Sequence, residues 1–422
     1  MILIYTPNIT PRIEYACEIL CRSVWKTDFQ LTQSEEDFKQ SSVLHKIAYA
    51  PENPGISQTL FIPAADLLRS DVLKPVDIPF FKGENIQGFF PVEGGEIPFD
   101  VLASVFYMVT RYEEYFPLKT DEHGRFLPQE SVLYQHKMLF YPVVNRWADF
   151  VKQKLSEISG KEISTSAEYR YSATYDIDRA FAYLCKSKWK KWGSFLKDVW
   201  KLNNFNIRKD PFDVFEYLYA QHQENNIQAI FFFLLGSGKP PDNNNNPSCE
   251  DFRKVMRRTA EQHETGLHAS YASTENLQTL IREKQLLEEI TGKDIKKIRQ
   301  HYIKTNMPGY FENVIKAGFT EDYSMGYPQI PGYRAGMSEP FRWFNLRTNS
   351  PTNLIIHPFS MMDSQHYYYQ YPEWMKITEQ MLQSAQSDKQ CFISVWHNHL
   401  LNTAKQKDYF KNHLRISSLK NP

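Results

Sequence analysis

Two aspartates end a strand-like segment, and their spacing suits hydrolytic chemistry. Residues 171–178 read Tyr-Ser-Ala-Thr-Tyr-Asp-Ile-Asp, so an alternating run leads into Asp176 and Asp178. In α/β proteins the carboxyl ends of strands are where ligands bind. One carboxylate of such a pair can hold a metal ion while the other takes a proton from water. The plain alternative is that both serve a solvated turn or begin a helix.

Histidines near later strand candidates could complete a metal site. His268 follows the short run 264–267, and a neutral imidazole there is a good zinc ligand. Arg299 and His301 are two residues apart in a strand-like stretch, so both side chains point to one side. An arginine beside a carboxylate lowers that carboxylate's pKa and fixes its orientation. His301 is then a further candidate ligand, although each histidine alone is more typical of a partly buried residue with ordinary partners.

Two more segments supply candidate residues. The strand candidate 392–396 ends at Trp396 and is followed by His397. A histidine at a strand end can act as a general acid toward a leaving amine. Trp396 either stacks on a sugar face or packs in the core. The glycine-containing stretch 332–338 includes Arg334, which could bind a substrate oxygen, but loops also use glycine for purely conformational reasons.

The order of elements predicts an α/β protein with two domains. From residue 169 onward strands and helices alternate over about 250 residues, which is typical of a parallel sheet or barrel. The polar stretch 160–167 is a reasonable boundary. We therefore expect an α/β accessory domain of unknown role over residues 1–165 and a (β/α) barrel over 166–422. Predicted barrel strands are 172–175, 229–235, 264–267, 298–301, 352–356 and 392–396, with helices at 213–225, 249–263 and 276–291.

The amino-terminal part and one loop complete this prediction. Apolar spacing predicts helices over 12–24, 98–116 and 143–158, and short strands at 2–5, 46–49 and 59–62. The stretch 236–248 contains Pro-Pro and four consecutive asparagines, so we expect a surface loop there. Arg111, Glu113 and Glu114 are expected to pair for structural reasons.

Composition excludes some classes of function. The chain has 422 residues, 49 of them basic and 49 acidic, and a formal net charge of zero, which argues against a general binder of nucleic acid or anionic membranes. The basic run 186–192 is better explained by a solvated helix face than by a membrane patch. No apolar stretch approaches about 18 residues, and the amino terminus lacks the features of a secretory signal.

The cysteines suggest a compartment. Five cysteines are scattered through the chain, which predicts reduced thiols in a cytoplasmic protein. Cys17 and Cys21 are four apart in a predicted helix. They could share a metal ion, but two small residues on one buried helix face is the better interpretation.

Taken in chain order, these motifs resemble the polysaccharide deacetylase superfamily, also known as the NodB-homology fold or carbohydrate esterase family 4. Residues 174–178 resemble the family's Thr-Phe-Asp-Asp-Gly motif, and 263–268 resemble the approach to its second motif. Residues 299–302 stand where the family has Arg-X-Pro-Tyr, and 395–397 resemble Leu-X-His. The resemblance covers about residues 169–415. It is strongest to a bacterial branch that carries an uncharacterised amino-terminal domain.

The resemblance implies both a fold and a reaction. The fold would be a distorted (β/α) barrel that holds a divalent metal, usually zinc. The reaction would be hydrolysis of an N-acetyl or O-acetyl group on a saccharide or a related small metabolite. By likeness Asp176 would be the general base, while Asp178 and His268 would be metal ligands. Arg299 would orient Asp176, and His397 would be the general acid.

This chain departs from the family's motifs at two points. Ile177 separates the two aspartates, whereas the family has them adjacent. The family's second ligand histidine lies four residues after the first, where this chain has Ala272. We therefore predict that His301 supplies the third ligand. Tyr302, together with Arg334 and Trp396, is expected to bind substrate.

Two alternatives remain open at this point. The chain could be a non-catalytic saccharide-binding or scaffold protein on a degenerate barrel, which the missing histidine favours. It could also hydrolyse an amide that is not part of a sugar, since a fold does not fix a reaction. The retention of the other motif residues together favours the deacetylase. A cytoplasmic location would fit a precursor or soluble saccharide better than a finished polymer.

Overall fold

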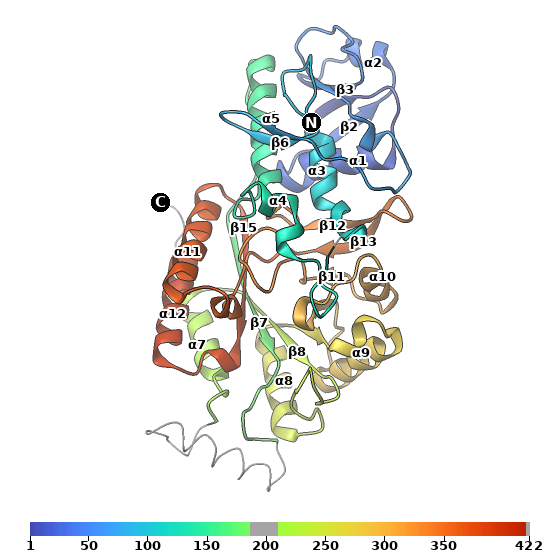
Figure 1. Cartoon of the computed structure of the whole chain (residues 1–422). Coiled ribbons are helices and arrows are strands. Elements are labelled where there is room, and N and C mark those ends of the chain that lie inside the picture. The colour runs from blue at the N-terminus through green and yellow to red at the C-terminus, as the bar shows by residue number, and fades with distance from the viewer. Residues whose placement is uncertain (118, 186–209, 419–422) are drawn as a thin grey trace. The chain divides into compact units, whose positions relative to one another are not determined.

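The computed structural model (Figure 1) describes residues 1–117, 119–185 and 210–418, so the basic run at 186–192 lies outside the described residues. The chain divides into two compact units. The first comprises residues 1–120, 129–168 and 333–355, and the second comprises 121–128, 169–332 and 356–422. A single boundary near residue 165 stays a prediction. Compared with that boundary, the segment 121–128 belongs to the second unit instead of the first, and the segment 333–355 belongs to the first instead of the second.

The first unit contains a parallel sheet with the strand order β2-β1-β3-β4. Its strands are β1 (Ile2–Tyr5), β2 (Phe29–Thr32), β3 (His45–Ala50) and β4 (Thr59–Pro63), followed by the antiparallel pair β5 (Phe80–Lys82) and β6 (Gln87–Phe89). Its helices are α1 (Pro11–Glu18), α2 (Glu35–Gln40), α3 (Val101–Val109), α4 (Val132–Gln135) and α5 (Val143–Ser159). β12 (Phe341–Asn345) and nearly all of β13 (Ser350–Ile356) also fall in this unit.

The helix predicted over 98–116 is shorter than expected. Asp100 begins α3 by accepting a hydrogen bond from the Ala103 backbone N–H at 2.9 Å, as an N-cap residue does. The helix ends at Val109, because Arg111 adopts a left-handed backbone conformation with φ of 53°. Arg111 then bonds Glu113 and Glu114 at 2.7 and 2.8 Å, which confirms the expected structural pairing.

The second unit is built on a parallel sheet whose strands run in the order β11-β10-β9-β8-β7-β15-β14. These strands are β7 (Arg170–Ile177), β8 (Ala229–Leu234), β9 (Glu264–Ala269), β10 (Lys297–Gln300), β11 (Glu321–Asp322), β14 (Met361–Met362) and β15 (Cys391–His397). The helices are α7 (Phe215–Asn225), α8 (Glu250–Gln262), α9 (Leu277–Thr291), α10 (Gly309–Lys316), α11 (Tyr371–Ser387) and α12 (Ala404–Ser418). The predicted strand–helix alternation is thereby confirmed, except that the strand predicted at 352–356 is β13, nearly all of which falls in the first unit.

No strand pairing joins β11 to β14, so a gap separates these two strands. The backbone of residues 357–360 bonds to both sides of this gap. His357 donates to the Asp322 carbonyl at 2.8 Å, and Ser360 donates to the Ile393 carbonyl at 2.9 Å. An α/β fold with a central parallel sheet is therefore observed, while closure into a barrel stays a prediction.

The apolar core of this unit follows from its sequence. All six residues of β8 are buried, as its unbroken apolar run predicts for a strand covered on both faces. Ile230 and Phe232 pack with Ile303, Tyr323 and Phe359, so the core reaches the segments that follow β10 and β11.

The cysteines differ from expectation. Cys185 and Cys249 form a disulfide across a separation of 64 residues, so the prediction that all five thiols are reduced is wrong. Disulfides persist mainly in oxidising compartments, which removes the argument from which a cytoplasmic location was predicted. Cys17 and Cys21 are buried and unpaired, and burial raises the pKa of both thiols, as expected for packing residues. Within the described residues, no helix combines the length and apolarity needed to cross a membrane.

Candidate functional site

The polar residues singled out by the sequence meet at one edge of the sheet in the second unit. Parallel strands have their carboxyl ends at the same edge, so residues at those ends become neighbours. The strand register shows this directly, because His397 pairs with Asp176 and Arg299 pairs with His268. Residues gathered at this edge are Asp176, Asp178, His268, Arg299, His301 and His397.

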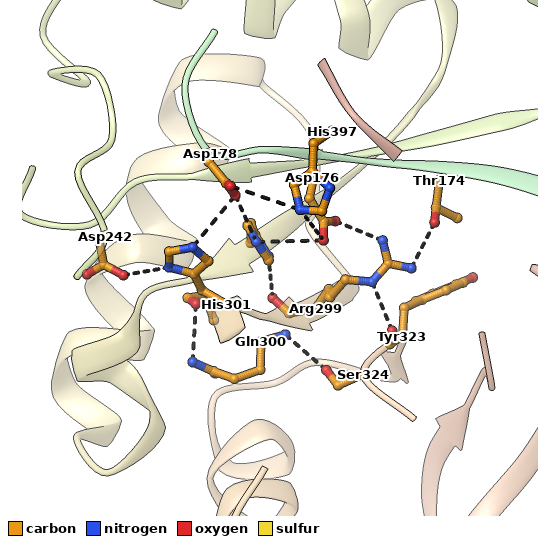
Figure 2. A network of polar contacts seen from close by, with 12 residues as sticks. Thr174, Asp176, Asp178, Asp242, Arg299, Gln300, His301, Tyr323, Ser324 and His397 are labelled. Carbon is orange, nitrogen blue, oxygen red and sulfur yellow. Dashed lines mark hydrogen bonds and ion pairs between the residues drawn. The ribbon is translucent and has the colours of Figure 1, made fainter. Parts of the chain in front are cut away.

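Asp178, His268 and His301 form a group that could hold a metal ion. One ligand atom from each residue lies within 4.8 Å of the others. The Nε2 atoms of His268 and His301 are 3.2 and 3.8 Å from Asp178 Oδ1. Figure 2 shows His301 between Asp178 and Asp242. His301 thus lies with Asp178 and His268 in this group, and its role as the third ligand stays a prediction.

In both histidines the partner of Nδ1 orients the ring so that Nε2 faces the site. His268 Nδ1 lies 3.0 Å from the Arg299 carbonyl, and His301 Nδ1 lies 2.8 Å from a carboxylate oxygen of Asp242. Both partners are hydrogen-bond acceptors, so Nδ1 of each ring carries a proton, and in the neutral form of the ring the lone pair is on Nε2. The acceptor behind a ligand histidine is the usual arrangement around protein metal ions.

The electrostatics of the group fit a cation. Asp178 Oδ1 is buried and accepts no hydrogen bond from any described residue. Burial raises the pKa of Asp178, but His268, His301 and His397 outweigh it and hold the pKa well below its usual range. Burial lowers the pKa of His268, and the two aspartates raise it by more. An ionised carboxylate and two imidazole lone pairs that converge repel one another unless a proton or a cation lies between them, so these residues fit a divalent ion.

Arg299 fixes Asp176 beside this group. The guanidinium is fully buried and donates to Asp176 Oδ1 at 2.8 Å, to Thr174 Oγ1 at 2.9 Å and to the Tyr323 carbonyl at 2.9 Å (Figure 2). Burial raises the pKa of Asp176, but Arg299, His268 and His397 together outweigh this effect and the net pKa is lowered. The carboxylate is therefore ionised. Its second oxygen, Oδ2, lies 3.8 Å from His268 Nε2 and 4.0 Å from His397 Nε2, facing the site.

The pKa of His397 is shifted in the opposite direction to that of Asp176. Its Nδ1 lies 2.6 Å from Asp363 Oδ1, and its backbone N–H donates to Asp363 Oδ2 at 2.7 Å. Burial lowers the pKa of His397, but Asp363 and then the two site aspartates raise it to about 10. The imidazole is therefore protonated at neutral pH, with Nε2 4.0 Å from carboxylate oxygens of Asp176 and Asp178. A bound cation would reduce the part of this pKa increase that comes from Asp176 and Asp178. The part that comes from Asp363 would remain.

A cavity of about 340 Å³ is lined by Asp176, Asp178, His268, His301 and His397. Tyr302, Tyr367 and Tyr368 contribute aromatic walls, and Tyr367 and Tyr368 are 67% and 64% exposed. The segment 121–128 also contributes, through Glu122, His123 and Arg125. Tyr302 therefore stands where a substrate-binding residue would, and that role stays a prediction.

Two residues expected to bind substrate lie elsewhere. Trp396 is 1% exposed, donates to Ser394 Oγ at 2.8 Å and packs edge-on against Phe410. Arg334 belongs to the first unit, where it donates to the Glu114 carboxylate at 2.8 Å. Neither residue lines the cavity, so nothing in this site supports a substrate-binding role for them, and that role stays a prediction.

The sequence interpretation missed three contributors to the site: Asp242, Asp363 and the segment 121–128. Asp242 lies in the stretch 236–248, which was expected to be a surface loop. It is instead buried, and it also accepts a hydrogen bond from the Tyr271 backbone at 2.8 Å. Its signal was its position after a buried parallel strand, at the same edge as Asp176. Asp363 directly follows β14, a strand of only two residues that the sequence pattern did not indicate, and the segment 121–128 follows no strand.

One buried carboxyl group behind the site gives a testable stability effect. Glu283 accepts from the Ser270 backbone at 3.0 Å, and burial raises its pKa to about 7. A raised folded-state pKa means that the folded chain holds this proton more tightly than the unfolded chain. The contribution to stability is therefore full below pH 4.5 and is lost as pH rises to about 7. At pH 8, Glu283→Gln should raise the free energy of unfolding by up to about 3 kcal/mol.

Urea unfolding of the wild type and Glu283→Gln at pH 5 and pH 8 checks this. The advantage of the variant should be larger at pH 8, because glutamine keeps an acceptor for Ser270 without a charge. Equal differences at both pH values would show that Glu283 does not titrate in this range.

Comparisons with known proteins match the amino-terminal part to one family model and find likenesses to solved structures. Residues 2–160 match the model of a family of unknown function, DUF7033, which spans less than half of the chain. No curated protein matches the sequence.

The solved structures that resemble this chain include polysaccharide deacetylases. A putative polysaccharide deacetylase from Mycobacterium smegmatis has 13% identity and a TM-score of 0.43, covering 62% of this chain and 87% of that one. A probable polysaccharide deacetylase from Pseudomonas aeruginosa PAO1 has 10% identity and a TM-score of 0.40, covering 59% and 84%. The Puue allantoinase has 11% identity and a TM-score of 0.40, covering 60% and 84%. The chemistry of this chain must therefore be inferred from its own site.

Proposed function

We propose that this protein is a metal-dependent hydrolase that removes an N-acetyl or O-acetyl group from a saccharide or a related metabolite. The observation that carries the proposal is that Asp176 Oδ2 lies 4.0 Å from His397 Nε2, beside the Asp178–His268–His301 group. The surroundings lower the pKa of Asp176 and raise that of His397. Two neighbouring groups whose pKa values are pushed apart form an acid–base pair.

Asp176 is suited to act as the base. Arg299 occupies Oδ1, so the free Oδ2 can take a proton from a water molecule in the cavity. A divalent ion, when bound, would act as a Lewis acid on the carbonyl oxygen and on the attacking water. Arg299 would keep Asp176 in a single orientation throughout the reaction.

His397 is suited to act as the acid. Cleavage of an acetamide expels an amine, which is a poor leaving group until it receives a proton. His397 Nε2 can give that proton, while Asp363 holds Nδ1 and keeps the ring oriented. After the transfer, the Asp363 carboxylate favours return of the proton to the ring.

The donor set favours zinc as the resident ion. Two imidazole nitrogens and one carboxylate are typical of catalytic zinc sites, which keep another position for water or substrate. Asp242 behind His301, and the Arg299 carbonyl behind His268, would orient the two rings.

The cavity walls support a saccharide as the substrate. Tyr367 and Tyr368 present exposed aromatic surface together with hydroxyl groups beside the acid–base pair. Tyrosine combines an apolar face with a polar end, which suits the apolar face and hydroxyl rim of a sugar ring.

Acetate release tests the proposal. The zinc-loaded protein would be incubated with N-acetylglucosamine oligomers, an O-acetylated xylo-oligosaccharide and a simple acetamide without a sugar. We expect acetate from a saccharide, loss of activity after chelation and recovery when zinc is returned. Saccharide binding without acetate release by any metal-loaded form would favour a non-catalytic binding protein. Cleavage of the simple amide alone would favour a hydrolase of non-sugar amides.

A further inference from the structure

The turn that follows His301 has an uncommon backbone. Tyr302 and Ile303 both adopt positive φ values, 60° and 53°, in the left-handed region that favours glycine. For a β-branched residue such as isoleucine this conformation is a genuine outlier. Strained backbone of this kind persists only where the surrounding structure holds it. Since the turn begins at a proposed metal ligand, the groups that hold it also determine where His301 points.

One side of the turn is held by the apolar core. Ile303 is buried and packs with Phe232, Tyr323 and Phe359. Its carbonyl accepts a hydrogen bond from the Thr305 backbone at 2.9 Å. These contacts fix the end of the turn but leave the Tyr302 peptide to be held from the cavity side.

The cavity side of the turn is held by Arg125. Its Nη1 donates to the Tyr302 carbonyl at 2.7 Å. Arg125 is itself fixed by Asp121, because Oδ2 accepts from Arg125 Nε at 2.7 Å and Oδ1 accepts from the Arg125 backbone at 2.9 Å. The His123 ring packs against the Tyr302 ring at 4.9 Å between centroids.

The segment that makes these contacts comes from an unexpected part of the chain. Residues 121–128 belong to the second compact unit, yet they lie within the 2–160 stretch that matches DUF7033. The turn after His301 is thus held by residues that lie far in the sequence from the other residues of the site.

We propose that Arg125 is a positioning residue for the metal site: through the Tyr302 carbonyl it fixes the turn that directs His301 Nε2 toward Asp178. This inference rests on the metal group of the proposed function. It also gives the region that matches DUF7033 a role, because Arg125 belongs to that region and would keep the metal site in its geometry.

Zinc affinity provides a readout that does not depend on activity. The dissociation constant would be measured on full-length protein by competition with a chromogenic chelator. Arg125→Met keeps the volume of the side chain, which is only 12% exposed, but removes every donor. Arg125→Lys keeps a cationic donor for the Tyr302 carbonyl. Arg282→Met, on the exposed face of α9, is the matched control.

We expect Arg125→Met to weaken zinc binding by about 10- to 100-fold, as loss of a group behind a metal ligand typically does. Arg125→Lys should restore most of the affinity, and Arg282→Met should match the wild type. In a His301→Ala background, Arg125→Met should have no further effect, because its action passes through His301.

Each other result has a distinct meaning. Wild-type affinity in folded Arg125→Met would overturn the inference while leaving the proposed function intact. An equal loss in the His301→Ala background would also overturn it, because Arg125 would then act by another route. If the wild-type chain binds no zinc, that result would instead contradict the metal site of the proposed function. If Arg125→Met does not fold, Arg125→Lys carries the test, and a loss as large as 100-fold in that variant would count against the proposed contact.

Discussion

Asp176→Asn is expected to lower kcat by roughly 100- to 10,000-fold, which is the range that a general base contributes. Asparagine has nearly the shape of aspartate and still offers an oxygen to Arg299 Nη1. It cannot take a proton from water, so the loss should appear in kcat while zinc binding persists. This separation follows because Asp176 Oδ2 faces the cavity but Asp176 is not one of the three proposed ligands.

The same variant carries a stability cost that must be measured beside activity. Arg299 is fully buried, and Asp176 is its anionic partner at 2.8 Å. Removal of one member of a buried ion pair typically costs about 3–5 kcal/mol. The remaining bonds of Arg299, to Thr174 and to the Tyr323 carbonyl, should keep the chain folded.

Steady-state kinetics, metal content and urea unfolding of Asp176→Asn would be compared with Asp408→Asn, an exposed aspartate of α12. Asp408→Asn should behave as wild type in all three. A folded, zinc-loaded Asp176→Asn that keeps kcat within a few-fold of wild type would show that another group is the base.

His301→Ala is expected to weaken zinc binding by more than about 100-fold, which exceeds the typical effect of a group behind a ligand. His301 Nε2 lies 3.8 Å from Asp178 Oδ1, while Asp242 holds its Nδ1 at 2.8 Å. Without this imidazole the site would retain only Asp178 and His268, and two protein ligands fall short of the three found in catalytic zinc sites.

His399→Ala is the matched control, because His399 lines the same cavity but is not part of the ligand group. Burial lowers the pKa of His399 to about 4, so it is a neutral side chain that removal should affect little. Competition with a chelator would give both affinities. Loss of zinc in His268→Ala but not in His301→Ala would contradict the assignment of His301 as the third ligand.

Local pattern was sufficient to predict the longer strands of the second unit and several residues at their ends, but not the two-residue strands β11 and β14. Asp176, His268 and His397 follow apolar or alternating segments, and parallel pairing brings such positions to one edge without further information. Two-residue spacing placed Asp176 and Asp178 on the same side, with Ile177 buried between them.

The same periodicity bears on the expected role of Trp396. Adjacent residues of a strand point to opposite faces, so a site that uses His397 directs Trp396 away from it. Trp396 is accordingly packed against Phe410 and His413. Strand alternation favoured the packing role that the sequence interpretation left open.

The remaining parts of the site depend on contacts between distant segments. Asp363 meets His397 across 34 residues, and Arg125 meets Tyr302 across 177. The Cys185–Cys249 disulfide and the Arg334–Glu114 ion pair are likewise long-range, and no local spacing encodes them. Such pairings follow from tertiary structure, which a single sequence does not reveal.

The metal content of the full-length protein tests the central claim most directly. Protein loaded with zinc and dialysed would be analysed by plasma mass spectrometry, with Asp178→Asn prepared in parallel. We expect about one zinc ion per chain in the wild type and almost none in Asp178→Asn, because Asp178 is the anionic member of the ligand group. A wild type without retained metal, or an Asp178→Asn variant that retains as much as the wild type, would contradict the assignment of this site.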